Sequence, residues 1–429
     1  MYQKKNKKIT PYSKIFDDLF YLNRSIMGEG YNKSLKILDK FFKFKYYKFT
    51  SGKKIFSWTV PKEWIVKRAY ILTPSKKKIC DYNKNNLHLM NYSSDFNGKI
   101  NLNSLKKILN SNKLLPNAIP YTTTYYNQKY GFNISYNEEK KLKEGLYKVK
   151  IDTKFKKGNI ILGEKTLKGT NNKDFLLSSY LCHPLMANNE LSGPLVLLGI
   201  FEKIKKWKFK NYNYKFLVNP ETIGSLCYLN KKRKSIKKKL AGGLVFTCLG
   251  GPKNQLSFKK TKNNNSSINK FFKYFQKIGK VNLREFTPLT GSDERQYCSP
   301  GFDLPVGQIS RTVYKEYKEY HTSLDNKKFM NIKKIKDSVD LIEYFLNTFD
   351  KLNGRLKRSN PYGEVFLNQY NLYKNKNSNN LTKTIIYLLS ESDSTVEVID
   401  VVTKYNLKIE DTIDAIKILE KNKIAKLIQ

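Results

Sequence analysis

Three histidines occur in the 429 residues, and two of them stand in loops with acidic neighbours. His183 follows an apolar run in CHPLMANNELSGP, and His321 lies in EYHTSLD beside Asp325. Neutral imidazole is the commonest metal ligand in proteins, and carboxylates usually complete the set. The two loops therefore predict a zinc site, against the alternative of two hydrogen-bonded structural histidines. His88 lies in a β-rich region, and we do not expect it to be a ligand.

Other polar residues in similar loops could take part in catalysis. Glu221 stands in NPETIGS after a predicted strand, where a carboxylate beside a metal could act as a general base. The alternative for Glu221 is an acidic residue favoured by a helix N-terminus, and both can hold. The loop GSDERQYCSPG carries Asp293, Glu294 and Arg295, which suit substrate contact or metal ligation, or else a mutual salt bridge. Cys182 ends an apolar strand, which favours a buried, inert thiol over a nucleophile.

The elements that must position these residues follow from the apolar periodicity. Residues 10–48 predict two helices, and residues 57–152 contain short β-rich runs separated by Pro, Ser, Asn and Gly. After residue 174 strands, loops and helices alternate, which predicts an α/β fold with helices on both faces of a sheet. Ligands gather at the carboxyl ends of the strands in such sheets. A polar linker (374–380) precedes three helical segments and a β-prone end, the plan of a winged helix-turn-helix.

Composition narrows the class of protein. The chain has 81 Lys+Arg and 36 Asp+Glu, so its net charge is 81 − 36 = +45, and its 40% hydrophobic content excludes a disordered tail. The charge is compatible with a nucleic-acid or anionic-membrane partner, but lysines occur in every segment, which favours a general compositional bias. The densest basic block (231–239) is expected to be a solvated turn.

The cysteines and the absence of long apolar runs predict the cellular compartment of the protein. Five cysteines without a Cys-x-x-Cys pair indicate neither a disulfide framework nor a zinc knuckle, and a reducing compartment fits best. The N-terminal sequence lacks the apolar region of a signal peptide, and no run approaches the length of a membrane span. We therefore expect a soluble, cytoplasmic protein with no membrane partner.

The four loop motifs CHPLMANNELSGP, NPETIGS, GSDERQYCSPGFDLP and EYHTSLD, preceded by VPKEW and NNLHLMNYS, together resemble a known family. It comprises bacterial aminopeptidase-like proteins that carry a domain of unknown function within a zinc-peptidase fold. The resemblance covers nearly the whole chain, including YLNRSIMGEG and the C-terminal winged helix. Such proteins look like relatives of the co-catalytic zinc aminopeptidases and glutaminyl cyclases, and some are encoded with polysaccharide-biosynthesis genes.

The resemblance implies a division of the chain and a fold. It implies a zinc-aminopeptidase-like mixed sheet flanked by helices, with an inserted β-rich domain and a C-terminal winged helix. We expect a discontinuous catalytic domain at residues 1–58 and 150–355, the insert at 59–149 and the winged helix at 375–429.

The resemblance also implies roles for single residues. His183 and His321 match an early and a late zinc ligand, and Glu221 matches the carboxylate that activates water. This chain has Asn189, followed by Glu190, where the two-zinc peptidases have a bridging Asp. It also has Thr222 and Thr247 where those enzymes have a second Glu and a further Asp.

Because an amide or a hydroxyl does not replace a bridging carboxylate, we predict one zinc ion rather than two. Its expected ligands are His183, Glu190, Asp293 and His321. The residues expected to contact substrate are Asn189, Glu294 and Arg295.

Two functions follow as hypotheses. The first is a zinc-dependent aminopeptidase-like hydrolase that cleaves a peptide or amide bond, with a link to polysaccharide biosynthesis. The second is a catalytically degenerate peptidase fold that senses a ligand and acts through its winged helix. In that case a protein partner or dimerisation is favoured over nucleic acid, because the candidate recognition segment KIEDTIDAIKILEKN mixes acids with lysines.

Overall fold

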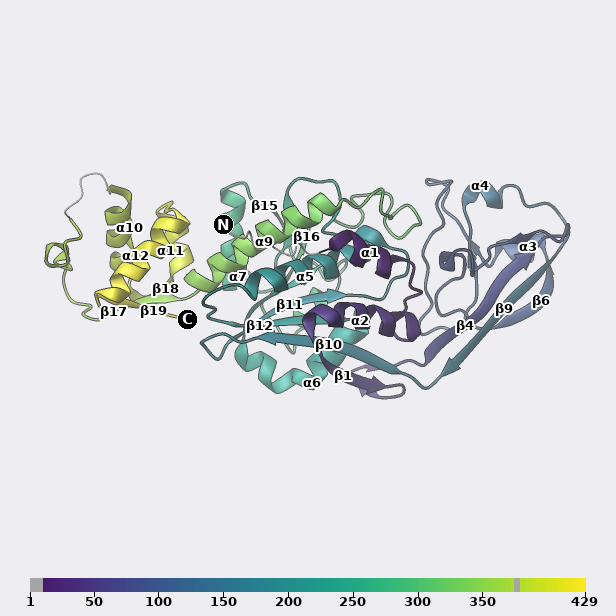
Figure 1. Ribbon diagram of the computed structural model, residues 1–429, viewed down its shortest axis with the longest axis horizontal. Coiled ribbons are helices and arrows are strands. Elements are labelled where there is room, and N and C mark those ends of the chain that lie inside the picture. The colour runs from purple at the N-terminus through teal and green to yellow at the C-terminus, as the bar shows by residue number, and fades with distance from the viewer. Residues whose placement is uncertain (1–10, 374–378) are drawn as a thin grey trace, which may run out of the picture.

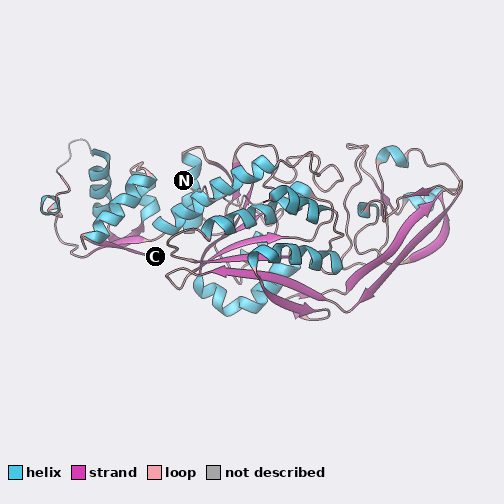
Figure 2. Cartoon of the chain, viewed as in Figure 1, coloured by secondary structure: helices cyan, strands magenta, loops and turns pink. Residues whose placement is uncertain are grey.

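The structure is a computed structural model that describes residues 11–373 and 379–429. The molecule is elongated, as Figure 1 shows, with a large sheet in the middle, a β-rich part at one end and a C-terminal helical part at the other. Figure 2 shows that the long strands lie in the middle and in the β-rich part. No helix among the described residues is both long enough and apolar enough to cross a membrane.

The central sheet has eight strands. Neighbouring strands β12, β11, β13 and β16 pair in parallel, as do β14 and β15, whereas β1, β10 and β14 join by antiparallel pairing. Strand β11 is buried along its whole length, as expected for a central strand covered on both faces. In spatial order the strands are β1 (Lys45–Thr50), β10 (Asn159–Leu167), β12 (Asn213–Asn219), β11 (Asp174–Tyr180), β13 (Leu240–Phe246), β16 (Val306–Ser310), β14 (Leu256–Lys259) and β15 (Val281–Arg284).

Helices cover both faces of this sheet. One apolar core joins one face to α1 (Tyr12–Phe20), α2 (Glu29–Phe42), α5 (Ser192–Ile204), α7 (Ser267–Lys277) and α9 (Ile332–Leu352). A second core joins the other face to α6 (Ile223–Lys239) and the short α8 (Glu294–Tyr297). In α1 the buried residues recur at three- and four-residue spacing, which is the pattern that predicts such a helix.

The β-rich part forms its own sheet. Its strands pair antiparallel in the order β5 (Lys78–Ile79), β4 (Glu63–Leu72), β9 (Leu146–Lys156) and β6 (Phe96–Asn101). Alternate residues of β9 from Tyr147 to Thr153 are buried, so one face of this sheet packs and the other meets solvent. Shorter elements complete this part of the chain: β2 (Lys54–Ile55), β3 (Trp58–Thr59), η1 (Asn86–His88), α3 (Leu102–Lys106), β7 (Leu109–Asn110), β8 (Phe132–Asn133) and α4 (Tyr136–Glu139).

The C-terminal part contains three helices and a three-stranded sheet. The helices are α10 (Asn379–Ser390), α11 (Val398–Lys404) and α12 (Ile409–Lys421), and a short η3 (Leu367–Tyr370) precedes them. The sheet order is β18 (Asp393–Glu397), β17 (Arg355–Arg358), β19 (Ala425–Ile428). Ion pairs from Lys270 on α7 to Glu397 and Asp400 hold this part against the central one. The winged helix stays a prediction, and residues 374–378 of the predicted linker lie outside the described residues.

Two local predictions from the sequence are wrong. The basic block 231–239 is not a turn, because α6 continues to Lys239. Lysine is a good helix former, and cations in the last turn interact favourably with the helix dipole. Residues 45–48, the end of the range in which the sequence predicted two helices, belong to strand β1 on the edge of the main sheet.

We expect Gly193→Ala to destabilise the protein, because α5 begins in close contact with the sheet. A Cβ atom at Gly193 would lie 2.3 Å from Ser179 Oγ and 2.5 Å from the Phe246 carbonyl oxygen. Overpacking of this kind costs about 1–3 kcal/mol of unfolding free energy, measured by urea denaturation. Gly301→Ala is the matched control, because nothing lies within 4 Å of its Cβ position. Equal stability of the two variants would contradict the predicted close packing.

Candidate metal centre and its cavity

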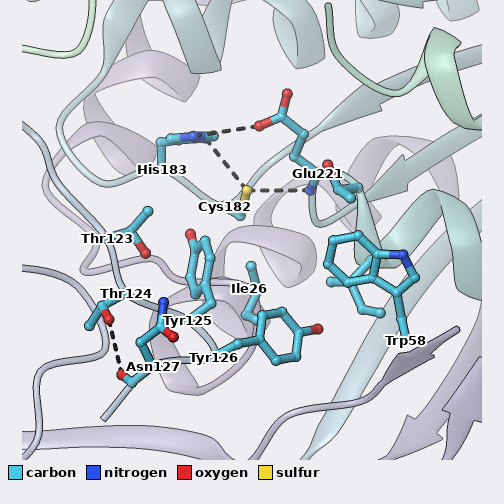
Figure 3. A pocket seen from close by; sticks show the side chains of 12 residues that line it. Ile26, Trp58, Thr123, Thr124, Tyr125, Tyr126, Asn127, Cys182, His183 and Glu221 are labelled. Carbon is cyan, nitrogen blue, oxygen red and sulfur yellow. Dashed lines mark hydrogen bonds and ion pairs between the residues drawn. The ribbon is translucent and has the colours of Figure 1, made fainter. Parts of the chain in front are cut away.

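The candidate residues lie where the parallel strands end. His183 follows the carboxyl end of β11, and Glu221 follows the carboxyl end of β12. Figure 3 shows both side chains on one side of a cavity, with Tyr125, Tyr126 and Trp58 across from them. This is the edge of an α/β sheet at which ligands bind.

A single carboxylate fixes the ring and the backbone of His183. Glu190 Oε2 lies 2.6 Å from His183 Nδ1, and Glu190 Oε1 accepts the backbone N–H of His183 at 2.9 Å and the backbone N–H of Cys182. With Nδ1 committed to Glu190, only Nε2 of His183 is open to a ligand. Burial lowers the pKa of His183, but the negative charge of the Glu190 carboxylate at 2.6 Å raises it, and the pKa lies well above 6.5.

Glu221 faces the open nitrogen of His183. Its Oε2 lies 3.7 Å from His183 Nε2, and its Oε1 accepts the Ser292 hydroxyl at 2.6 Å. The side chain is 26% exposed, and burial raises the pKa of Glu221 above 4.5. A carboxylate with a raised pKa that borders a cavity has the character of a general base.

His321 lies beside His183 and has an unsatisfied nitrogen. The two ring centroids are 5.2 Å apart, and His321 Nε2 is buried without a hydrogen-bond partner among the described residues. Burial and the neighbouring His183 lower the pKa of His321 to about 3, so its ring is neutral at pH 7. A neutral imidazole with a free buried nitrogen is a ready metal ligand.

The β-rich part completes the wall around the two histidines. Pro120 forms a β-bridge with Thr322, and the backbone N–H of Tyr121 donates to the His321 carbonyl oxygen at 2.8 Å. The Tyr121 ring lies 5.1 Å from the His183 ring and 5.4 Å from the His321 ring. A segment some 200 residues away in the chain therefore fixes the loop that carries His321.

Strained backbone accumulates around these residues. Thr222, directly after Glu221, has φ of 61°, and His321 has φ of 54°; Leu185 and Cys248 have φ of 51° and 54°. A positive φ is unfavourable for residues with a Cβ, and above all for a β-branched threonine. Such strain is typical of sites where the surrounding structure holds a functional conformation.

Asn189 and Thr247, which the resemblance matches to acids of the two-zinc peptidases, belong to a hydrogen-bond network of neutral groups. Thr247 Oγ1 lies 2.5 Å from the Tyr180 hydroxyl, and Asn189 Nδ2 donates to that hydroxyl at 3.1 Å. Asn189 Oδ1 is buried and has no hydrogen-bond partner among the described residues. Asp325 holds the backbone at Asn188 and Asn189, because its carboxylate accepts hydrogen bonds from both N–H groups.

The three charged residues of the 291–301 loop lie away from the cavity lining. Asp293 accepts the Thr222 backbone N–H at 2.6 Å and the Asn219 amide at 2.9 Å, and so supports the turn that carries Glu221. Glu294 is buried in an ion pair with Lys259 at 2.9 Å. Arg295 donates to the Ser292 and Pro288 carbonyl oxygens.

The cavity has a volume of about 300 Å³. Its lining comes from the central part and from the β-rich part of the chain: Ile26, Trp58, Thr123, Thr124, Tyr125, Tyr126, Asn127, Cys182, His183, Glu221, Thr222 and Ile223. Burial raises the pKa of the Cys182 thiol to about 12, so Cys182 is protonated at neutral pH and is not an activated nucleophile.

The two imidazoles of the site suit a metal ion. Two imidazoles on one tetrahedral zinc place their ring centroids about 5 Å apart, which matches the pair His183 and His321. The unsatisfied His321 Nε2 and the open His183 Nε2 are the nitrogen donors, and Glu221 and Glu190 are the nearby carboxylates. Among the described residues, the ligand atoms that lie within 4.8 Å of one another are those of Cys182, His183 and Glu190, a group that does not include His321 or Glu221.

The sequence analysis missed two residues that position the site. The buried Arg24 donates from Nε to the His183 carbonyl oxygen at 3.0 Å and from Nη1 to the Leu19 carbonyl oxygen. Arg24 stands in the YLNRSIMGEG motif, whose part in the resemblance was the available signal. Tyr121 carried no signal, because its role arises from a contact across the fold.

The fold is that of the aminopeptidase-like proteins. A solved structure from Clostridium acetobutylicum, described as a "putative peptidase", matches with a TM-score of 0.86 and 32% identity over 97% of this chain and 96% of that chain. BSAP, a zinc aminopeptidase from Bacillus subtilis, shares the fold with a TM-score of 0.58 and 12% identity, over 78% of this chain and 93% of that chain.

The chain belongs to the family described as "Domain of unknown function (DUF4910)", whose model matches residues 13–352. A Clostridium acetobutylicum protein named "Putative polysaccharide biosynthesis protein with aminopeptidase-like domain" is 36% identical over 364 residues, which is 84% of this chain and 82% of that protein. The resemblance drawn from the loop motifs is confirmed, and so is the mixed sheet flanked by helices.

The pKa of His321 predicts a pH dependence of stability in metal-free protein. The folded pKa of about 3 lies below the ordinary 6.5, so His321 contributes stability that is fully present above pH 6.5 and is lost as pH falls from 6.5 to 3. Between pH 7.5 and 5.5 wild type should lose roughly 1.4 kcal/mol relative to His321→Gln. Urea denaturation with a chelator measures this difference, and parallel pH profiles would contradict the neutral buried ring.

Proposed function

We propose that this protein is a one-zinc hydrolase of the aminopeptidase type that cleaves an amide or peptide bond. The observation that carries the proposal is the pairing of two imidazoles, 5.2 Å apart, with a carboxylate 3.7 Å from one of them at the edge of a cavity. His183 and His321 would hold the ion through their Nε2 atoms. Glu190 would orient His183, since its oxygens are occupied by three N–H groups of the loop.

The proposed number of metal ions follows from the residues that stand where the two-zinc peptidases have acids. Asn189, Thr222 and Thr247 are neutral, and Thr247 and Asn189 bond to Tyr180. Asp293 is engaged in holding the turn before α6. These contacts support a single ion and argue against a co-catalytic pair.

Each side chain of the site would have its own role in the proposed hydrolysis. A bound zinc would polarise the amide carbonyl and acidify water in the cavity. Glu221 would take the proton of the attacking water on Oε2 and deliver it to the leaving amine. The Ser292 hydroxyl, bonded to Glu221 Oε1, would keep the other oxygen directed toward His183. The walls from the β-rich part would limit water access.

The substrate is proposed to be a small molecule that carries an amide or a peptide N-terminus. The cavity volume of about 300 Å³ suits one residue-sized group beside Glu221. The name of the Clostridium acetobutylicum relative supports a role in polysaccharide biosynthesis.

Three units are proposed for the chain: residues 1–58 with 150–355, residues 59–149, and residues 375–429. Residues 1–10 and 375–378 of these ranges lie outside the described part of the chain. The last unit would serve as a winged helix for protein contact or dimerisation. The four acids on α12, Glu410, Asp411, Asp414 and Glu420, would disfavour DNA.

Elemental mass spectrometry of the purified protein tests the metal site. Wild type should carry about one zinc per chain after zinc is supplied, and His183→Ala and His321→Ala should lose it. His88→Ala is the matched control, since His88 bonds to Asn133 in the β-rich part. Two ions in wild type, or none, would contradict the one-zinc centre, and none would favour a ligand-sensing protein.

Glu221→Gln separates chemistry from metal binding. The amide keeps the shape of the side chain but cannot accept a proton, so kcat/KM should fall roughly 100- to 10,000-fold while zinc content stays unchanged. Hydrolysis of a panel of aminoacyl amides and N-acyl amino sugars, followed by mass spectrometry, measures this effect. Glu202→Gln on α5 is the control variant. Full activity of Glu221→Gln would exclude this residue as the base.

A further inference from the structure

A second cavity adjoins the one at His183 and Glu221. It has a volume of about 440 Å³, and Tyr125, Tyr126 and Asn127 line both cavities. The remaining lining residues of this second cavity are Pro61, Lys62, Tyr92, Ser94, Asp95, Gln128 and Phe155. The segment 125–127 therefore borders both the cavity with the candidate catalytic carboxylate and this larger one, which we call the outer cavity.

The outer cavity combines aromatic faces with free polar side chains. Tyr126 is 50% exposed and Phe155 is 41% exposed, although large aromatic rings normally gain by burial. The side chains of Asp95, Asn127 and Gln128 are exposed and have no hydrogen-bond partner among the described residues. An amide both donates and accepts hydrogen bonds, and a carboxylate accepts them.

The rings are held in place before any ligand binds. The Tyr126 hydroxyl donates to the Thr59 carbonyl oxygen at 3.2 Å, and the Tyr126 ring meets the edge of Trp58 with centroids 5.6 Å apart. The ring centroid of Tyr92 lies 5.0 Å from that of Tyr125 and 5.9 Å from that of Phe155. Fixed rings lose little entropy when a ligand stacks on them.

We propose that the outer cavity is a sugar-binding subsite and that the substrate is an amide-bearing glycan. A sugar ring has an apolar C–H face that fits an aromatic ring, and its hydroxyls donate and accept like the amides of Asn127 and Gln128. The glycosyl part would occupy the outer cavity while the amide of a neighbouring sugar enters the inner one. This inference rests on the proposed hydrolase function for the reaction, but sugar binding itself needs no turnover.

Saturation-transfer NMR and calorimetry on the full-length, zinc-supplied protein test the subsite. The probes are tri-N-acetylchitotriose, cellotriose and trigalacturonate, with the tripeptide amide Ala-Tyr-Ala-NH2 as the peptide probe. We expect tri-N-acetylchitotriose to bind. Tyr126→Ala should raise its Kd roughly fivefold to tenfold, because one aromatic contact is lost. Asn127→Ala is the second variant, and Tyr362→Ala, an 85% exposed tyrosine in the C-terminal part, is the matched control.

Each outcome decides the proposal. Weaker tri-N-acetylchitotriose binding in Tyr126→Ala and Asn127→Ala, with unchanged binding in Tyr362→Ala, supports it. No binding of any saccharide, or binding that both cavity variants leave unchanged, overturns it. Peptide binding that Tyr126→Ala abolishes, without saccharide binding, also overturns it and assigns the cavity to a peptide.

The sugar subsite and the hydrolase function can fail separately. Hydrolysis that depends on Glu221, found without saccharide binding, would reject the sugar subsite alone. Saccharide binding without hydrolysis would reject the hydrolase alone.

Discussion

The contact between Glu190 and His183 is the constraint on which the site depends. One buried carboxylate accepts hydrogen bonds from two backbone N–H groups and from the imidazole at Nδ1, so it holds the loop after β11 at three points. Removing a carboxylate of this kind would leave its buried donors unpaired, at a cost of about 1–3 kcal/mol for each. The geometry leaves His183 Nε2 as the nitrogen that faces Glu221. Arg24, between α1 and α2, and Asp325, in the His321 loop, hold the same region by hydrogen bonds.

The second histidine depends on a different part of the chain. His321 has a left-handed backbone conformation and is held by pairing with residues 119–121 of the β-rich part. The same part supplies Tyr121 behind the histidines and the aromatic wall in front of Glu221. The β-rich part is therefore a component of the site, and changes within it should alter ligand binding more than the chemistry at Glu221.

The sequence predicted the framework because its signals are local. Runs such as FLLSSYLC are mostly apolar since β11 is covered on both faces. The loops after two strands pointed to His183 and Glu221 as candidates, and the EYHTSLD motif pointed to His321. The orienting role of Glu190 and the support from Asp293 were not predictable, because both depend on which hydrogen-bond donors surround a carboxylate in three dimensions. Tyr121 was missed for the same reason. Strand β1 was missed because its alternation, with Tyr47 and Phe49 buried, spans only six residues.

The central claim is that His183 and His321 share one metal ion. Anomalous X-ray diffraction at the zinc edge, on crystals grown with zinc, tests this claim most directly because it locates each ion and its ligands. The account predicts one anomalous peak in the site, bonded to Nε2 of both histidines and bordered by Glu221. Two peaks with separate ligand sets, or a peak that leaves either histidine unbound, would contradict it.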